Sequence, residues 1–235
     1  MSFRTSVTIV ASPRPRTGKT LLARLLIDFN IHEGRGVAAF DLNAGDGTLA
    51  QFSPAHARAS EIGDIKGEMA LFDRLVADDG VSKIVDLGHE KFETFFELAR
   101  RLDFADEARR RGIAPSILFI ATPDATSVEA YRKLGTKLPE VARTPVHNEL
   151  LGNAQRDRYP IMGAEQLRFS VLAPALRRYI EKPPFSFADE ALANARNIPL
   201  DVHIELQRWL RKMYMKFREL DSRVLQADLQ SSVRI

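Results

Sequence analysis

The stretch Ser12–Thr20 (SPRPRTGKT) decides the fold of this chain of 235 residues. It follows an apolar run over 6–11 that is typical of a buried strand, and it leads into a helical apolar pattern over 19–32. A strand, a tight loop ending in Gly-Lys-Thr and a helix together form the arrangement of a phosphate-binding P-loop. The backbone N–H groups of the loop and of the helix N-terminus are then expected to face a polyphosphate.

The side chains of this loop suggest separate roles. Lys19 is placed to reach the β- and γ-phosphates, the Thr20 hydroxyl is placed to bind Mg²⁺, and Gly18 lets the backbone approach closely. The usual pattern has a glycine where this chain has Pro13, and Pro15 is a second departure, so two backbone donors are missing. The alternative is a chance Gly-Lys-Thr at the start of a helix. The residues expected to line the nucleotide here are Arg16, Thr17, Gly18, Lys19, Thr20 and Leu21.

The composition sets limits on the class of protein. The length suits one large α/β domain, and no apolar run approaches the ~20 residues of a membrane span. The chain has no cysteine, which excludes disulfides, Fe–S clusters and thiolate metal sites and fits a cytoplasmic protein. Its formal net charge is +3, so binding to nucleic acid or a membrane surface would need a local basic patch.

Apolar strand patterns alternate with helical patterns along the chain. The strand candidates are 6–11, 36–42, 82–87, 115–121, 144–148 and 167–172. The helix candidates are 19–32, 65–78, 90–102 with a continuation to 110, 126–137, 174–181, 185–195 and 201–226. This alternation predicts an α/β fold with a doubly wound, mostly parallel sheet and helices on both faces. The turn at Pro183-Pro184 divides it into a nucleotide-binding domain over 1–182 and a helical C-terminal extension over 183–235, packed on the same domain.

Two strand candidates end in an aspartate. Asp41 closes the strand over 36–42, and Asp86 closes the strand over 82–87. In an open α/β sheet, ligands lie at the carboxyl ends of the strands, so both carboxylates are expected near the phosphates and Mg²⁺. For Asp41 the alternative is a turn or helix-capping aspartate, a common role for this residue type.

Taken in order, these motifs resemble the ParA/MinD family of deviant Walker A ATPases. When the chain is aligned on Gly18–Thr20, the signature lysine of that family falls on Arg14. The segment Phe40–Asn43 (FDLN) is similar to the family's Asp-Leu-Asp after its second strand. The segment Ile117–Pro123 (ILFIATP) also fits, and Val146–Asn148 is similar to the strand end whose asparagine reads adenine. The resemblance covers roughly residues 5–175.

The resemblance implies ATP and Mg²⁺ as cofactors and a homodimer that holds two nucleotides between its subunits. Arg14 would then reach the partner's phosphates, although a guanidinium is not equivalent to the family's lysine. Asn43 stands where the family has an acid that positions water, and an amide cannot accept a proton, so hydrolysis is expected to be slow or absent. Asp46 could replace that acid. The implied catalytic residues are Lys19, Asp41, Asn43 and Arg14, the metal ligands Thr20, Asp41 and Asp86, and the adenine contact Asn148.

The C-terminal helix candidate carries two faces. Its apolar stripe is Leu206, Leu210, Met213, Phe217, Leu220 and Val224, and its basic face holds Arg208, Arg211, Lys212, Lys216 and Arg218. Such a helix can pack on its own domain, pair with a second copy, or bind non-specific DNA or an anionic membrane surface. The sequence leaves these three alternatives open.

The function predicted from the resemblance is an ATP-dependent dimerisation switch that acts on a protein partner and positions or partitions a cargo. Two other classes of function remain open. A nucleotide-binding scaffold without catalysis is favoured by Pro13, Pro15 and Asn43. An ATP-dependent metabolic ligase on the same fold would need further polar residues near the loop.

Overall fold

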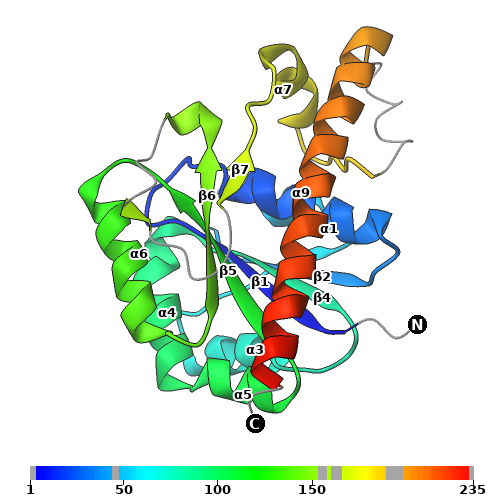
Figure 1. The fold of residues 1–235 in the computed structure, drawn as a ribbon. Coiled ribbons are helices and arrows are strands. Elements are labelled where there is room, and N and C mark those ends of the chain that lie inside the picture. The colour runs from blue at the N-terminus through cyan, green and yellow to red at the C-terminus, as the bar shows by residue number, and fades with distance from the viewer. Residues whose placement is uncertain (1–3, 44–47, 153–157, 160–165, 189–197, 233–235) are drawn as a thin grey trace.

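A parallel β-sheet forms the centre of the molecule. The structure is a computed structural model that describes residues 4–43, 48–152, 158–159, 166–188 and 198–232. Seven strands lie in the order β3-β2-β4-β1-β5-β6-β7, and each neighbouring pair is parallel (Figure 1). The strands are β1 (Ser6–Ala11), β2 (Val37–Asp41), β3 (Ala57–Ala59), β4 (Ser82–Asp86), β5 (Ala114–Ala121), β6 (Ala142–Asn148) and β7 (Leu167–Phe169).

Helices cover both faces of this sheet. One face packs against α1 (Lys19–His32), α2 (Leu49–Phe52), α7 (Pro174–Ile180) and α9 (Leu200–Ser232). The other packs against α3 (Ile65–Leu75), α4 (Phe92–Arg101), α5 (Phe104–Arg110) and α6 (Ala125–Lys137). Short 3₁₀ turns lie at His89–Lys91 and Glu149–Leu151. The predicted doubly wound parallel sheet with a helical C-terminal appendage is confirmed.

The strands divide their side chains between two cores. Successive residues of a strand point to opposite faces, so Ile9 and Phe119 enter the core under α3–α6, whereas Val10 and Leu118 enter the core under α1 and α9. Burial on both faces explains why these strands read as continuous apolar runs in the sequence. It also places the carboxyl ends of β1, β2 and β4 at one edge, where the site lies.

Two predicted helices differ in the structure. The expected helix over 90–102 does not continue to 110, because Asp103 adopts a left-handed backbone (φ 47°) between α4 and α5. The expected helix over 185–195 is absent over 185–188, where the backbone N–H of Phe187 bonds Asp28 of α1 instead of a helical carbonyl. The rest of that prediction lies outside the described residues.

Two predicted elements are shorter in the structure, and two short elements of the structure were not predicted. The strand expected over 167–172 ends at Phe169, and the helix expected over 65–78 ends at Leu75. Strand β3 and helix α2 were not predicted, since three- and four-residue elements carry too little periodicity to be recognised.

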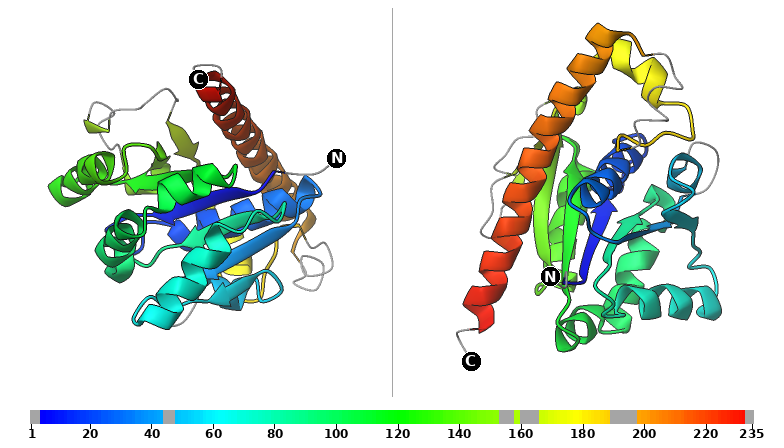
Figure 2. Two further views of the ribbon diagram at one scale, coloured as in Figure 1. Left: turned by 90° about the horizontal axis from the view of Figure 1, so that it is seen from below. Right: turned by 90° about the vertical axis from the view of Figure 1, so that its right-hand side faces the viewer.

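The C-terminal helix packs on its own domain. In Figure 2 it runs along one side of the sheet, and its stripe residues Leu206, Leu210, Met213 and Phe217 are buried in the core that contains α1. The rings of Tyr214 and Phe217 lie 5.5 and 5.4 Å from that of Phe29. Through Leu220, therefore, the stripe is covered by this chain and is not available to a second copy. No described helix is both long enough and apolar enough to cross a membrane.

Replacing Met213 with alanine should destabilise the whole domain. Met213 is fully buried between α9 and the sheet, and truncating such a side chain costs about 2–5 kcal/mol. Chemical denaturation measures the effect. Met215→Ala is the matched control, because Met215 is 60% exposed on the same helix and should change stability by less than about 0.5 kcal/mol. Equal, small effects would mean that α9 is not part of the cooperative unit.

Candidate functional site

The loop between β1 and α1 has an unusual backbone. Arg16 and Gly18 both adopt left-handed conformations, with φ of 56° and 95°. Gly18 is also crowded, since a Cβ there would lie 2.9 Å from Nδ2 of Asn148. The N-terminus of α1 has no capping hydrogen bond from a described side chain. Its first N–H groups therefore suit an anionic ligand.

The side chain of Lys19, the first residue of α1, folds back onto the preceding loop. Its side chain is buried, and Nζ donates a hydrogen bond to the carbonyl oxygen of Arg14 at 2.9 Å. Burial lowers the pKa of Lys19, while the nearby charge of Asp86 acts in the opposite direction. A phosphate oxygen would be a stronger acceptor than this carbonyl, because the hydrogen bond would then join two charged groups.

Thr20 and Asp86 form the centre of the site. Strands β1 and β4 are neighbours with Val10 opposite Asp86, and the Thr20 hydroxyl donates to Oδ2 of Asp86 at 2.7 Å. Asp86 is fully buried, and its other oxygen, Oδ1, has no hydrogen-bond partner among the described residues. Burial raises the pKa of Asp86 to about 7; the Thr20 bond opposes this rise and the charge of Asp41 adds to it.

This pair fits a magnesium ion. A hydroxyl and an unsatisfied carboxylate oxygen are the hard oxygen donors that Mg²⁺ prefers, and Mg²⁺ usually keeps several waters and phosphate oxygens besides. Among the described residues no three histidine or acidic side chains gather into a site that could hold a metal by themselves. Thr20 and Asp86 would therefore hold the ion together with the phosphates.

Both carboxylate oxygens of Asp41 already accept hydrogen bonds from nearby residues of this chain. Its Oδ1 accepts hydrogen bonds from the backbone N and Nδ2 of Asn43 at 3.0 and 2.9 Å, and its Oδ2 accepts one from the backbone N of Ala50 at 2.8 Å. These are the contacts of the turn-or-cap alternative. Only Oδ2, which accepts a single hydrogen bond, keeps a free lone pair for a direct bond from Asp41 to a metal. Asn43 also donates to the carbonyl oxygen of Asp86 at 3.2 Å, so its amide braces two strand ends. Asp46 lies outside the described residues.

Arg14 has a partner in its own chain. Its Nε and Nη2 both donate to Oδ1 of Asp124, at 2.9 and 2.6 Å, while its side chain is 43% exposed. Asp124 also accepts bonds from Thr122 and from the backbone N of Ser127 at the start of α6. Burial alone would raise the pKa of Asp124, but these hydrogen bonds outweigh it and hold the pKa at about 2. The sequence did not indicate this partner.

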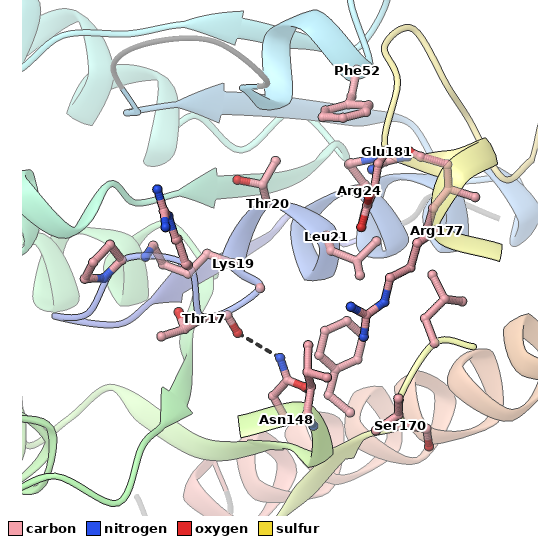
Figure 3. A pocket seen from close by; sticks show the side chains of 18 of the residues that line it. Thr17, Lys19, Thr20, Leu21, Arg24, Phe52, Asn148, Ser170, Arg177 and Glu181 are labelled. Atoms are coloured by element: carbon pink, nitrogen blue, oxygen red, sulfur yellow. Dashed lines mark hydrogen bonds between the residues drawn. The ribbon is translucent and has the colours of Figure 1, made fainter. Parts of the chain in front are cut away.

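Asn148 braces the loop from the far side. Its Nδ2 donates to the carbonyl oxygen of Thr17 at 2.9 Å, as the dashed line in Figure 3 shows, and its Oδ1 accepts from the backbone N of Leu150. The predicted contact of Asn148 with adenine remains a prediction, since both ends of the amide already bind this chain.

A pocket of about 410 Å³ adjoins the loop. The predicted nucleotide contacts all line it: Arg16, Thr17, Gly18, Lys19, Thr20, Leu21 and Asn148. Arg24 and Arg177, which the sequence analysis missed, line it too (Figure 3). Four lysine or arginine side chains and one carboxylate, Glu181, thus surround the space, and this excess of positive charge suits a polyanion. Arg24 had a signal in the sequence, since it lies one helical turn after Thr20.

Comparisons with known proteins give fold-level similarity and no family. No family model matches the chain, and no curated protein matches its sequence. Among solved structures, it is similar to the Signal Recognition Particle 54 kDa protein from Aeropyrum pernix K1 in complex with GDP (14% identity, TM-score 0.48, 89% of this chain and 49% of that one). It is also similar to the MinC:MinD cell division protein complex of Aquifex aeolicus (12% identity, TM-score 0.45, 88% of this chain and 95% of that one). The chain spans about half the length of the first protein.

Asp86→Asn should stabilise the protein at high pH in EDTA without nucleotide. The folded-state pKa of about 7 lies above the ordinary value of 3.8, so the folded protein loses stability as the pH rises from about 4 to 7. The amide removes this penalty, and the gain should be on the order of 4 kcal/mol at pH 8 and close to zero at pH 4. Thermal unfolding against pH measures it.

Asp73→Asn, at an exposed position of α3, is the control for that experiment and should change the stability by less than about 0.5 kcal/mol. If Asp86→Asn were neutral or destabilising at pH 8, Asp86 would not be a strained buried carboxylate.

Proposed function

We propose that this protein binds ATP with Mg²⁺ at the Ser12–Thr20 loop and uses the bound nucleotide as a dimerisation switch, with slow or absent hydrolysis. The observation that carries the proposal is the hydrogen bond between Thr20 and the buried Asp86, beside Lys19 and at the head of a cationic pocket. A lysine, a hydroxyl and a buried carboxylate in this arrangement supply the phosphate and metal contacts of a P-loop.

The phosphates would replace contacts that the chain now makes with itself. Lys19 would exchange the carbonyl oxygen of Arg14 for phosphate oxygens. The guanidinium of Arg16 lines the same pocket and has no partner among the described residues. Mg²⁺, when bound, would neutralise phosphate charge next to Thr20 and Asp86. The buried carboxylate would thereby gain a counter-charge for its unsatisfied oxygen.

Slow turnover is supported by the contacts of Asn43. Its amide is engaged by Asp41 and by the backbone of Asp86, and an amide cannot take a proton from an attacking water. Asp41 could do so chemically, but both of its oxygens bind the surrounding loop and α2. The arrangement therefore favours binding over hydrolysis.

The switch is assigned to Arg14. This half-exposed cation lies on the nucleotide loop and is held by Asp124 of the same chain. In a dimer it would exchange that carboxylate for a phosphate of the partner subunit's nucleotide. Such a dimer would act on a protein partner or cargo. The outer face of α9, where Arg208, Arg211 and Lys212 are exposed, offers a surface for DNA or an anionic membrane.

Lys19→Ala should weaken the binding of MgATP by about 10- to 100-fold, because it removes a charge-assisted contact with the phosphates. Titration calorimetry measures the affinity. Lys66→Ala, at an exposed position of α3 far from the pocket lining, is the control and should bind normally. Equal affinity of the Lys19 variant and the wild type, or a wild type that binds no nucleotide, would contradict the proposal.

Asn43→Asp should raise the rate of ATP hydrolysis, since it supplies a carboxylate beside the phosphates. The same change should lower stability without Mg²⁺, because it replaces the donor to Asp41 with a third negative charge near Asp86. Phosphate release and thermal unfolding measure the two effects. A wild type that already turns over at about 1–100 per second would show that Asn43 does not limit the reaction.

ATP should shift the wild type from monomer toward dimer, and Arg14→Ala should abolish this shift while the monomer still binds ATP. Asp124→Asn should strengthen the shift, because the neutral amide holds Arg14 less tightly in its own chain. Light scattering with and without ATP measures the shift from monomer to dimer in the wild type and in each variant. A dimer that forms without nucleotide and ignores both substitutions would favour the scaffold class.

A further inference from the structure

Residues of β6, β7 and α7 line the pocket together with the nucleotide loop, and one cation among them has no partner among the described residues. Arg177 projects into the pocket from α7 (Figure 3). Its side chain is half-buried and makes no hydrogen bond or ion pair with any residue that the structure describes. Leaving a cation partly desolvated and unpaired lowers the stability of the folded protein. A binding group is expected to be in this state when its ligand is absent.

Neighbouring arginines are engaged with this chain. Arg24 donates to the carbonyl oxygen of Ile180 at 2.8 Å, and its guanidinium lies 3.8 Å from the ring centre of Phe52. Arg178 donates to the hydroxyl of Tyr179 at 2.8 Å and stacks on the same ring. Arg177, by contrast, points into the cavity (Figure 3).

The helix that carries Arg177 is held in place before any ligand arrives. Leu176 and Ile180 anchor α7 in the core that contains α1. The bond from Arg24 to Ile180 then ties the end of α7 to the helix that begins at the nucleotide loop. The helix backbone at Arg177 therefore needs no reordering when a ligand binds.

The walls around Arg177 suit a flat ring more than a phosphate. Phe169 and Leu172 line the pocket together with Arg177, and the ring of Phe169 also lies close to Gly18 of the nucleotide loop. Asn148, a polar group that could read the edge of a base, already donates to Thr17 and accepts from Leu150. The guanidinium plane of Arg177 offers contact with the face of the base instead.

We propose that Arg177 holds the nucleobase by stacking its guanidinium plane on the ring. This assignment rests on the proposed nucleotide binding and adds the residue that recognises the base. Arginine planes stack on bases and attract their π-faces. Every base offers such a face, so stacking tolerates different bases, and the pocket should accept ATP and GTP with affinities within about fivefold of each other.

The test compares a ligand that has a base with one that lacks it. Calorimetry is performed with MgATP and with magnesium tripolyphosphate on the wild type, Arg177→Ala, Arg177→Lys and the control Arg178→Ala. Arg177→Ala should weaken MgATP about tenfold and change tripolyphosphate by less than about twofold. Arg177→Lys should fail to restore ATP binding, because an ammonium is not planar. Arg178→Ala should bind both ligands as the wild type does.

Retained binding of tripolyphosphate also proves that the Arg177 variants are folded. The assignment is overturned if Arg177→Ala weakens both ligands equally, if it weakens neither, or if lysine restores full affinity. Discrimination between ATP and GTP beyond about twentyfold would show edge recognition and overturn it as well. A wild type that binds neither ligand would instead refute the proposed function, on which this assignment depends.

Discussion

The hydrogen bond from Thr20 to Asp86 joins the first residues of α1 to the end of β4, and the site is arranged around it. It exists because β1 and β4 are adjacent and parallel, so the loop after β1 and the last residue of β4 meet at the same sheet edge. Asp86 is fully buried, and one of its oxygens has no hydrogen bond among the described residues. Such a group destabilises the fold, so its presence points to a function that needs it.

The rest of the site keeps that carboxylate and the loop in place. Asn43 braces Asp41 and the backbone of Asp86 on one side, and Asn148 holds the loop through Thr17 on the other. Both asparagines therefore act on this chain in the structure. A rigid loop with braced neighbours is suited to bind a polyphosphate without large rearrangement, and the same bracing leaves few free groups for catalysis.

The wall of the pocket depends on two buried polar residues of α1. Arg24 bonds the end of α7, while Asp28 accepts hydrogen bonds from Ser186 and from the backbone of Phe187. Burial raises the pKa of Asp28, and these bonds together with the charge of Arg24 oppose that rise. The helix that begins at the nucleotide loop thus also fixes the opposite side of the cavity.

Sequence reasoning reached the local features of this molecule and missed the tertiary ones. The loop, its strand and helix and the parallel sheet were predictable, because apolar runs and the Gly-Lys-Thr pattern are contiguous in the chain. The pairing of Arg14 with Asp124 was not, since it joins residues 110 positions apart through the adjacency of β1 and β5. Likewise, Arg177 and Arg178 look equivalent in the sequence, and only the placement of α7 separates them.

A crystal structure with Mg²⁺ and a non-hydrolysable ATP analogue tests the central claim most directly. The account predicts the metal within about 2.1 Å of Oγ1 of Thr20 and Nζ of Lys19 on phosphate oxygens, no longer on the carbonyl oxygen of Arg14. A nucleotide bound elsewhere on the protein, or a bound nucleotide with Lys19 still on that carbonyl, would contradict it.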